Sequence, residues 1–236
     1  MEIPELVRAI LLVVAGYLIG GIPWSIIVAR LTGRTDPRTI GSGRTGGANA
    51  MRAMGPRLAL LSGILDLLKG TAAVLLARWL GAGTGVEVVA GLAAIVGHSR
   101  SPFLGLGGGR GVAPAFGGLL AFAPVIALLT VPLFVVVIAV TRYSSVGSLT
   151  ASAVAGILLA AATATQGWDP WLYLYAAGGT LLVWLFHTDN IQRLLAGTER
   201  KIRTPAEGGP AGGAASGDGS SGGGAADGSS RAGRPA

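Results

Sequence analysis

Two absences restrict what this chain can be: it has no cysteine, and it has few charged residues. Without cysteine it forms no disulfide, no thiolate metal site and no cysteine nucleophile. Only 12% of the 236 residues are charged, about half of the roughly 25% that is typical of a soluble domain. In contrast, 51% are hydrophobic and the mean hydropathy is +0.62. These values indicate an integral membrane protein.

Several motifs with well-known chemistry are also missing. The sequence contains no HExxH, no GxSxG and no cluster of carboxylates that would hold a metal. We therefore expect neither a metal nor a cofactor. The net charge of +7 comes from arginines that alternate with long apolar runs, and no basic helix or patch with interleaved aromatics is present. This distribution argues against nucleic-acid binding.

The apolar runs predict an all-α integral membrane protein with seven transmembrane helices, some of them short. A helix of about 20 residues crosses the hydrocarbon core. The candidate spans are residues 9–29, 58–80, 86–97, 112–123, 125–140, 149–164 and 171–186. The first run contains Gly16, Gly20, Gly21 and Pro23, and a signal peptide is the competing interpretation. The length of the run and the absence of a small-residue cleavage pattern argue against it.

The distribution of arginine predicts the orientation of the chain. Residues 30–57 carry six arginines against a single aspartate, which places this loop on the cytoplasmic side. The N-terminus is then outside and the C-terminus is cytoplasmic. Residues 1–203 form the predicted transmembrane domain. Residues 204–236 are rich in Gly, Ala, Ser and Pro and cannot bury a core, so a disordered cytoplasmic tail is predicted there.

Two charged residues lie inside the second candidate span. Asp66 and Lys69 are three residues apart, so they share a helix face and can form an ion pair. Charges within a spanning segment are costly and often mark a functional site. A structural ion pair near the interface is an equally good interpretation.

The stretch IGSGRTGGANAMR, residues 40–52, is rich in glycine and carries two arginines. Glycine lets the backbone N–H groups approach a ligand closely, and successive N–H groups form concavities that bind anions. Arginine adds bidentate recognition of phosphate. The stretch therefore predicts a phosphate site at the membrane surface, with an ordinary basic cytoplasmic loop as the alternative.

Four polar stretches converge on one membrane face in the predicted topology: residues 41–52, 98–110, 143–148 and 187–193. Three of them combine arginine with glycine or serine, which suits more than one phosphate group. His98 and His187 lie on the same face, although a histidine at a helix end is commonly a structural cap. Asp66 and Asp189 are the only nearby carboxylates. Because cations outnumber acids, the site suits acyl transfer from an acyl phosphate, whose leaving group needs charge neutralisation.

The same residues resemble a known family. IGSGRTGGANAMR resembles the first motif, GSGN-x-GATN-x-x-R, of the bacterial PlsY family of acyl-phosphate-dependent glycerol-3-phosphate acyltransferases. LGGGRGVAP resembles the second motif, GGKGVAT, and HTDNIQRLLAGTE resembles the third, HRENIxRLxxGTE. TRYSSVGSL is similar to TRYVSLASI, and GGIPWS and DLLKG also fit. The resemblance runs in order from Tyr17 to Ile202.

The resemblance implies a seven-helix fold in the bacterial inner membrane, with the active site on the cytoplasmic face. It implies transfer of a fatty acyl group from acyl phosphate to the 1-hydroxyl of sn-glycerol 3-phosphate, which gives 1-acyl-glycerol 3-phosphate (lysophosphatidic acid) and phosphate in the first step of phospholipid synthesis. The implied partners are these two substrates, membrane lipid, and a soluble enzyme that supplies acyl phosphate. The alternatives are a divergent non-catalytic paralogue and a transporter of a small phosphorylated anion.

Positions that match the family motifs supply the candidate site. The implied catalytic residues are Ser42, Arg52, Arg110, Ser145, Ser148, His187 and Asn190. The implied phosphate-binding residues are Gly41, Gly43, Asn49, Gly108, Gly109 and Gly111. The chain departs from the motifs at several positions: Arg44 replaces asparagine, Gly47-Ala48 replaces Ala-Thr, Arg110 replaces lysine, Pro114 replaces threonine, and Thr188-Asp189 replaces Arg-Glu. A substrate phosphate is the expected base, with His187 as the alternative.

Overall fold

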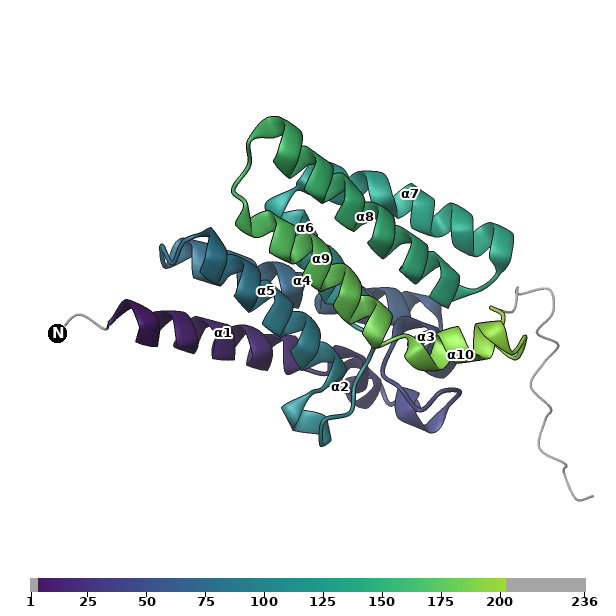
Figure 1. Ribbon diagram of the computed structural model, residues 1–236. Helices are drawn as coiled ribbons and strands as arrows, with labels where there is room; N and C mark the ends of the chain where they lie inside the picture. The colour runs from purple at the N-terminus through teal and green to yellow at the C-terminus, as the bar shows by residue number, and fades with distance from the viewer. Residues whose placement is uncertain (1–3, 203–236) are drawn as a thin grey trace, which may run out of the picture. The chain divides into compact units, whose positions relative to one another are not determined.

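The computed structural model describes residues 4–202, in which all regular structure is helical (Figure 1). The helices are α1 (Glu5–Gly21), α2 (Trp24–Leu31), α3 (Gly47–Met54), α4 (Pro56–Trp79), α5 (Thr84–Ser99), α6 (Val112–Phe122), α7 (Pro124–Thr141), α8 (Ser144–Gln166), α9 (Trp171–Leu185) and α10 (Thr188–Leu195), with 3-10 turns η1 (Pro37–Thr39) and η2 (Pro102–Leu104). The predicted all-α class is confirmed. The predicted disordered tail, residues 204–236, lies outside the described residues.

Three of these helices, α4, α7 and α8, are long and apolar enough to cross a membrane individually, and α1 and α2 qualify together as a bent pair. Helices α6 and α9 are apolar but shorter. The outward surface of α7 is apolar, with Val125, Leu128 and Val140 all more than 60% exposed, as expected of a helix in contact with lipid. The chain is thus a membrane protein, and its number of spans and orientation stay predictions.

The first apolar run is not one helix, which corrects the predicted span over residues 9–29. Helix α1 ends at Gly21, and α2 begins at Trp24 with its axis turned by 42°. Pro23 explains the break, because it has no N–H to donate to the preceding turn and it disfavours helical geometry at Ile22. The break leaves the Ile22 carbonyl oxygen free of the regular helical pattern, and a side chain from α4 uses it.

Glycines allow several helices to pack with their backbones in contact. Helix α1 lies along α5 (Figure 1), where a Cβ on Gly97 would collide with the Tyr17 carbonyl oxygen and one on Gly20 with the Ala94 backbone. A Cβ on Gly117 of α6 would likewise collide with the Leu67 carbonyl oxygen on α4. Small residues at helix crossings are typical of membrane proteins, in which close van der Waals packing drives helix association.

Short helices and turns connect the long helices at the end of the bundle that carries the polar stretches. Two predicted loops are wrong in detail: residues 47–54 of the predicted loop 30–57 form α3, and α8 begins at Ser144 within the predicted connection 141–148. The Ser25 hydroxyl of α2 donates to the Thr45 carbonyl oxygen at 3.0 Å, which fixes the first glycine stretch against the broken helix. The polar stretches are thus partly helical and anchored to the bundle.

Candidate active site

Three arginines from separate stretches surround the Asp189 carboxylate in the first turn of α10. The Arg110 guanidinium donates to Asp189 Oδ2 at 2.8 Å, and that of Arg193 donates to the same oxygen at 3.2 Å. Arg44 Nη2 lies 3.8 Å from Asp189 Oδ1. The structure therefore brings residues 41–52, 98–110 and 187–193 together, as the sequence predicts.

A second carboxylate, Glu199, joins this cluster to α8. Its Oε1 accepts hydrogen bonds from Asn190 at 2.6 Å and from the Ser145 hydroxyl at 2.9 Å, and its Oε2 accepts one from Arg193 at 2.7 Å. Three guanidinium groups thus face two carboxylates, so the arginine cluster (Arg44, Arg110, Arg193 with Asp189 and Glu199) keeps a net positive charge. This charge favours an anionic ligand.

The pKa values of the two carboxylates follow from these contacts. Burial raises the pKa of Asp189, but the hydrogen bond and charge of Arg110, with further help from Arg44 and Arg193, outweigh burial and hold that pKa below its usual range. The pKa of Glu199 is also lowered, because the bonds from Asn190, Arg193 and Ser145 outweigh burial. Both groups are ionised at neutral pH and are poor bases.

His187 is buried at the start of α10, with 2% of its surface exposed. Its Nδ1 lies 2.7 Å from the Val183 carbonyl oxygen, which can only accept, so Nδ1 carries the proton and Nε2 keeps a lone pair. Burial lowers the pKa of His187 to about 4, because the opposing effect of the Val183 hydrogen bond is smaller than that of burial and the positive charge of Arg110 lowers the pKa further. The imidazole is therefore neutral at pH 7.

Three polar atoms in or beside the arginine cluster lack hydrogen-bond partners. Among residues 4–202, Arg110 Nε, Asp189 Oδ1 and Asn190 Oδ1 are buried without such a partner. Buried polar atoms are nearly always satisfied in folded proteins, so an unpaired donor and acceptor within one cluster indicate a ligand that supplies the missing partners.

The first motif forms its own network beside the arginine cluster. Asn49 donates to the Ser42 hydroxyl at 3.0 Å and to the Arg44 carbonyl oxygen at 2.9 Å, and it accepts from the Arg52 guanidinium at 3.0 Å. Gly41 has φ +67°, and a Cβ there would lie 2.5 Å from Asn49 Oδ1, so only glycine suits this turn. Ser42 and Arg52 are exposed, and Arg52 binds Asn49 on α3 rather than Asp189.

The second motif packs against His98 near the C-terminal end of α5. The Gly109 N–H donates to the His98 carbonyl oxygen at 3.0 Å, and Gly111 adopts φ +78° immediately before α6. The His98 ring lies 3.6 Å from Asp66, which pairs with Lys69 at 2.7 Å. The predicted Asp66–Lys69 ion pair is confirmed, and Asp66 contacts His98 rather than the arginines around Asp189.

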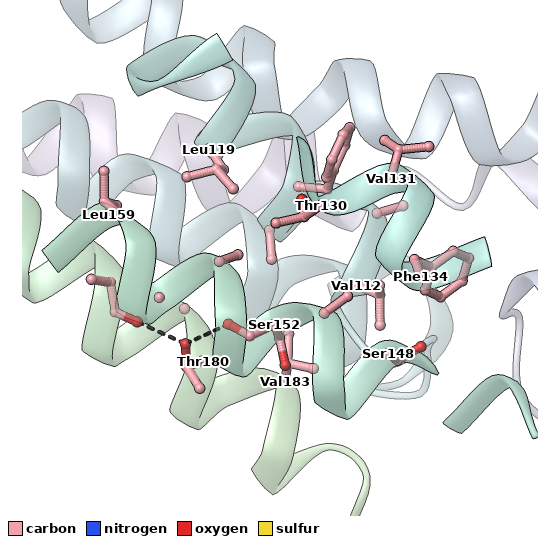
Figure 2. Close-up of a pocket in the computed structure, with 18 of the residues that line it drawn as sticks. Val112, Leu119, Thr130, Val131, Phe134, Ser148, Ser152, Leu159, Thr180 and Val183 are labelled. Carbon is pink, nitrogen blue, oxygen red and sulfur yellow. Dashed lines mark hydrogen bonds between the residues drawn. The ribbon is translucent and has the colours of Figure 1, made fainter. Parts of the chain in front are cut away.

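An apolar cavity of about 390 Å³ lies between α6, α7, α8 and α9. This volume falls within the range of roughly 300–1,000 Å³ that is usual for small-molecule sites. Figure 2 shows Ser148 and Val183 at one end and Leu119 and Leu159 at the other. Val183 lies one turn before His187, and Ser148 lies one turn after Ser145. The Ser148 end of the cavity therefore lies within one helical turn of Ser145 and His187.

Four members of the arginine cluster are not among the predicted site residues, although three of them carry some signal in the sequence. Asp189 and Arg193 are four residues apart and so share a helix face. Arg44 is one of the two arginines of the first glycine-rich stretch and departs from the family motif. Glu199 follows the last helix, and its partner Ser145 lies 54 residues earlier, so no local pattern joins them.

A helical membrane bundle with an apolar cavity and a nearby arginine cluster defines a class: membrane proteins with a site for an amphiphile that has an anionic head. A sequence model of glycerol-3-phosphate acyltransferase matches residues 10–197. Glycerol-3-phosphate acyltransferase 3 of Dehalococcoides mccartyi strain CBDB1 is 39% identical over 84% of this chain and 98% of its own length. The glycerol-3-phosphate acyltransferase of Rubrobacter xylanophilus is 41% identical over 86% of this chain and 98% of its own.

Two solved structures also match this chain. The crystal structure of PlsY, an integral membrane glycerol 3-phosphate acyltransferase in its glycerol 3-phosphate form, superposes with a TM-score of 0.75. It is 34% identical and covers 83% of this chain and 96% of that chain, and a second form of PlsY matches equally well. The chain belongs to the glycerol-3-phosphate acyltransferase family.

Proposed function

We propose that this protein transfers a fatty acyl group from acyl phosphate to the 1-hydroxyl of sn-glycerol 3-phosphate. One observation carries the proposal: the cavity of about 390 Å³ is apolar, and its Ser148 and Val183 end lies one helical turn from Ser145 and His187, next in the chain to the cluster where Arg44, Arg110 and Arg193 meet Asp189. An acyl chain fits the apolar part, and phosphate groups fit the cationic part. The unpaired Arg110 Nε and Asn190 Oδ1 supply one donor and one acceptor for the head groups.

The reaction is a direct displacement at the acyl carbonyl. The glycerol 1-oxygen forms a bond to the carbonyl carbon, the bond from that carbon to the phosphate oxygen breaks, and a substrate phosphate takes the proton of the hydroxyl. The products are 1-acyl-glycerol 3-phosphate and phosphate. The arginines hold both phosphates and neutralise the charge that grows on the leaving group, so positioning and electrostatics supply the rate enhancement.

A substrate phosphate is a better base than any side chain of the cluster. Phosphate monoesters have a second pKa near 6, roughly 100-fold more basic than His187 with its pKa of about 4. Asp189 and Glu199 are held ionised by arginine and are weaker bases still. In this proposal, Nε2 of His187 accepts a hydrogen bond from the attacking hydroxyl and orients it, while the phosphate takes the proton.

Three departures from the family motifs are in contact with one another, which supports activity rather than a non-catalytic paralogue. Arg44, Arg110 and Asp189 each replace another residue type of the family motif, and both arginines lie against the Asp189 carboxylate. At position 110 a planar guanidinium replaces the ammonium of lysine, and at position 189 the shorter aspartate side chain replaces that of glutamate. The three substitutions thus form a matched set that preserves the cationic character of the site.

The proposal includes seven spans: α1 and α4 to α9. Arginine-rich connections before α4 and after α5 then share the cytoplasmic face with α10 and the arginine cluster, and the N-terminus lies outside, as the charge rule requires. The site would open to the cytoplasm of a bacterial cell at its inner membrane, where a soluble enzyme can deliver acyl phosphate. Cysteine-accessibility labelling at either end of α1 tests this orientation in a chain that has no native cysteine.

The decisive experiment measures turnover by purified protein in lipid with palmitoyl phosphate and glycerol 3-phosphate. We expect equal amounts of 1-acyl-glycerol 3-phosphate and phosphate, loss of turnover in Arg52→Ala, reduced turnover in Arg110→Ala, and no loss in Arg57→Ala, an exposed arginine in the first turn of α4. Phosphate release without acylated product would show a hydrolase instead. Failure to complement a strain that lacks the acyltransferase would favour the non-catalytic alternative.

A further inference from the structure

We propose that Lys69, Asp66 and His98 form a buried polar chain that positions the second glycine loop, residues 108–111, and through it Arg110. The three side chains lie outside the arginine cluster, and the proposed reaction gives them no chemical step. The inference deepens the proposed function and rests on it for its kinetic readout. Lys69, Asp66 and His98 act as positioning residues because each side chain contacts the next, and the last one, His98, contacts the loop.

The polar chain begins at the break between α1 and α2. Lys69 of α4 donates from Nζ to the Ile22 carbonyl oxygen at 2.8 Å and pairs with Asp66 Oδ1 at 2.7 Å. The carbonyls at the C-terminal end of a helix lack partners and carry negative partial charge, so a buried ammonium caps α1 here. Lys69 therefore fixes the broken helix to α4.

The polar chain ends at the glycine loop. His98 Nδ1 lies 3.6 Å from Asp66 Oδ1, and the ring is buried. A Cβ on Gly109 would collide with His98 Nε2, which means that the imidazole fills the space directly over this glycine. The Gly109 N–H also donates to the His98 carbonyl oxygen. The loop is therefore seated on both the backbone and the ring of His98.

This seating matters because Gly109 precedes Arg110 directly. The Arg110 guanidinium must reach Asp189 and the proposed phosphate from the position that the loop gives it. A misplacement of about 1 Å can cost roughly 100-fold in rate. Burying two charges and an imidazole is also costly unless they are paired in good geometry. In this arrangement the contacts with Asp66 and Lys69 fix the position of the His98 ring against Gly109.

The test is a double-mutant cycle that uses steric compensation. Gly109→Ala places a methyl group against the His98 ring and should displace the loop, which raises KM for glycerol 3-phosphate at least about tenfold. His98→Asn keeps a donor near the position of Nδ1 but removes the ring from above Gly109. In the double variant the methyl group has room, so KM should return to within about threefold of the wild-type value.

Gly108→Ala is the matched control. Its Cβ would collide with the His98 carbonyl oxygen, which is backbone and stays in place in His98→Asn. The defect of Gly108→Ala should therefore persist in both backgrounds. The proposal is overturned if Gly109→Ala has the wild-type KM, or if adding His98→Asn does not lower the raised KM of Gly109→Ala. It is also overturned if His98→Asn lowers the KM of Gly108→Ala to the same extent.

Hydrogen exchange separates this inference from the proposed function. In wild-type protein the Gly109 amide should be protected, and Gly109→Ala should increase exchange across residues 108–111 without increasing it in α8, whatever the protein catalyses. Wild-type protein that has this protection but no acyltransferase turnover would refute the function and leave the positioning intact. Turnover with an unprotected loop would refute the positioning alone.

Discussion

The apolar cavity should measure the length of the acyl chain, and Gly179 of α9 offers a way to shorten it. Gly179 lines the cavity, and a Cβ there would lie 3.8 Å from Tyr175 Cε1 and 3.9 Å from Ile95 Cδ1, which is ordinary contact. Gly179→Ala should therefore fold normally and displace about one methylene of a bound chain. A methylene left unburied costs about 0.8 kcal/mol, or about fourfold in kcat/KM.

The assay compares kcat/KM for acyl phosphates of increasing chain length. We expect the loss of about fourfold to apply to the longest chain that the wild-type protein accepts, and short chains to be used as before. Gly178→Ala is the control, because its Cβ would instead lie 3.1 Å from Leu92 Cδ1 on the neighbouring helix α5. An equal loss at every chain length, or the same length dependence in Gly178→Ala, would refute the assignment of the cavity.

Three further predictions concern charge, pH and packing. Arg110→Ala should lower kcat/KM for glycerol 3-phosphate by roughly 10–150-fold, which corresponds to the loss of a charged hydrogen bond of about 1.5–3 kcal/mol. Arg110→Lys keeps the charge and should lower kcat/KM less, and steady-state kinetics of both variants test this difference. The pKa of His187 is about 4 in the folded protein and about 6.5 in the unfolded chain. As the pH drops, the unfolded chain therefore takes up the proton first. The free energy of unfolding should fall by up to roughly 3 kcal/mol between pH 6.5 and pH 4. His187→Asn should flatten this slope in thermal melts, and an unchanged slope would contradict the assigned pKa. Gly97→Ala should lower Tm because its Cβ meets the Tyr17 backbone, while Gly63→Ala, which has open space around it, should keep or raise Tm; equal effects would exclude backbone contact between α1 and α5 as the cause.

The long helices were readily predicted because their signals are local. The run over residues 58–80 corresponds to α4, and Pro124 starts α7 as its fixed φ favours. The prediction failed where local signals conflict: Pro23 divides an apolar run that is long enough to span, and the length of the run dominated the interpretation. Helices α3 and α10 have eight residues each, too few for periodicity to distinguish them from loops.

The site was predictable in its residue types and less so in its partners. The motifs identified Arg110, Ser145, His187 and Asn190, and the structure brings all of them to one end of the bundle. The contact between Ser145 and Glu199, and the cavity that starts near Ser148, depend on how α6 to α9 pack. Helix packing follows from side-chain fit over residues that are far apart in sequence, which a single sequence does not reveal.

The shared contact at Asp189 has a consequence for the evolution of this site. Because Arg44 and Arg110 both lie against one carboxylate, the effect of changing any of the three depends on which residues occupy the other two positions. Restoring the family residue at position 44 alone would be epistatic with positions 110 and 189. Grafting one motif between relatives should therefore succeed only when its contact partners are transferred with it.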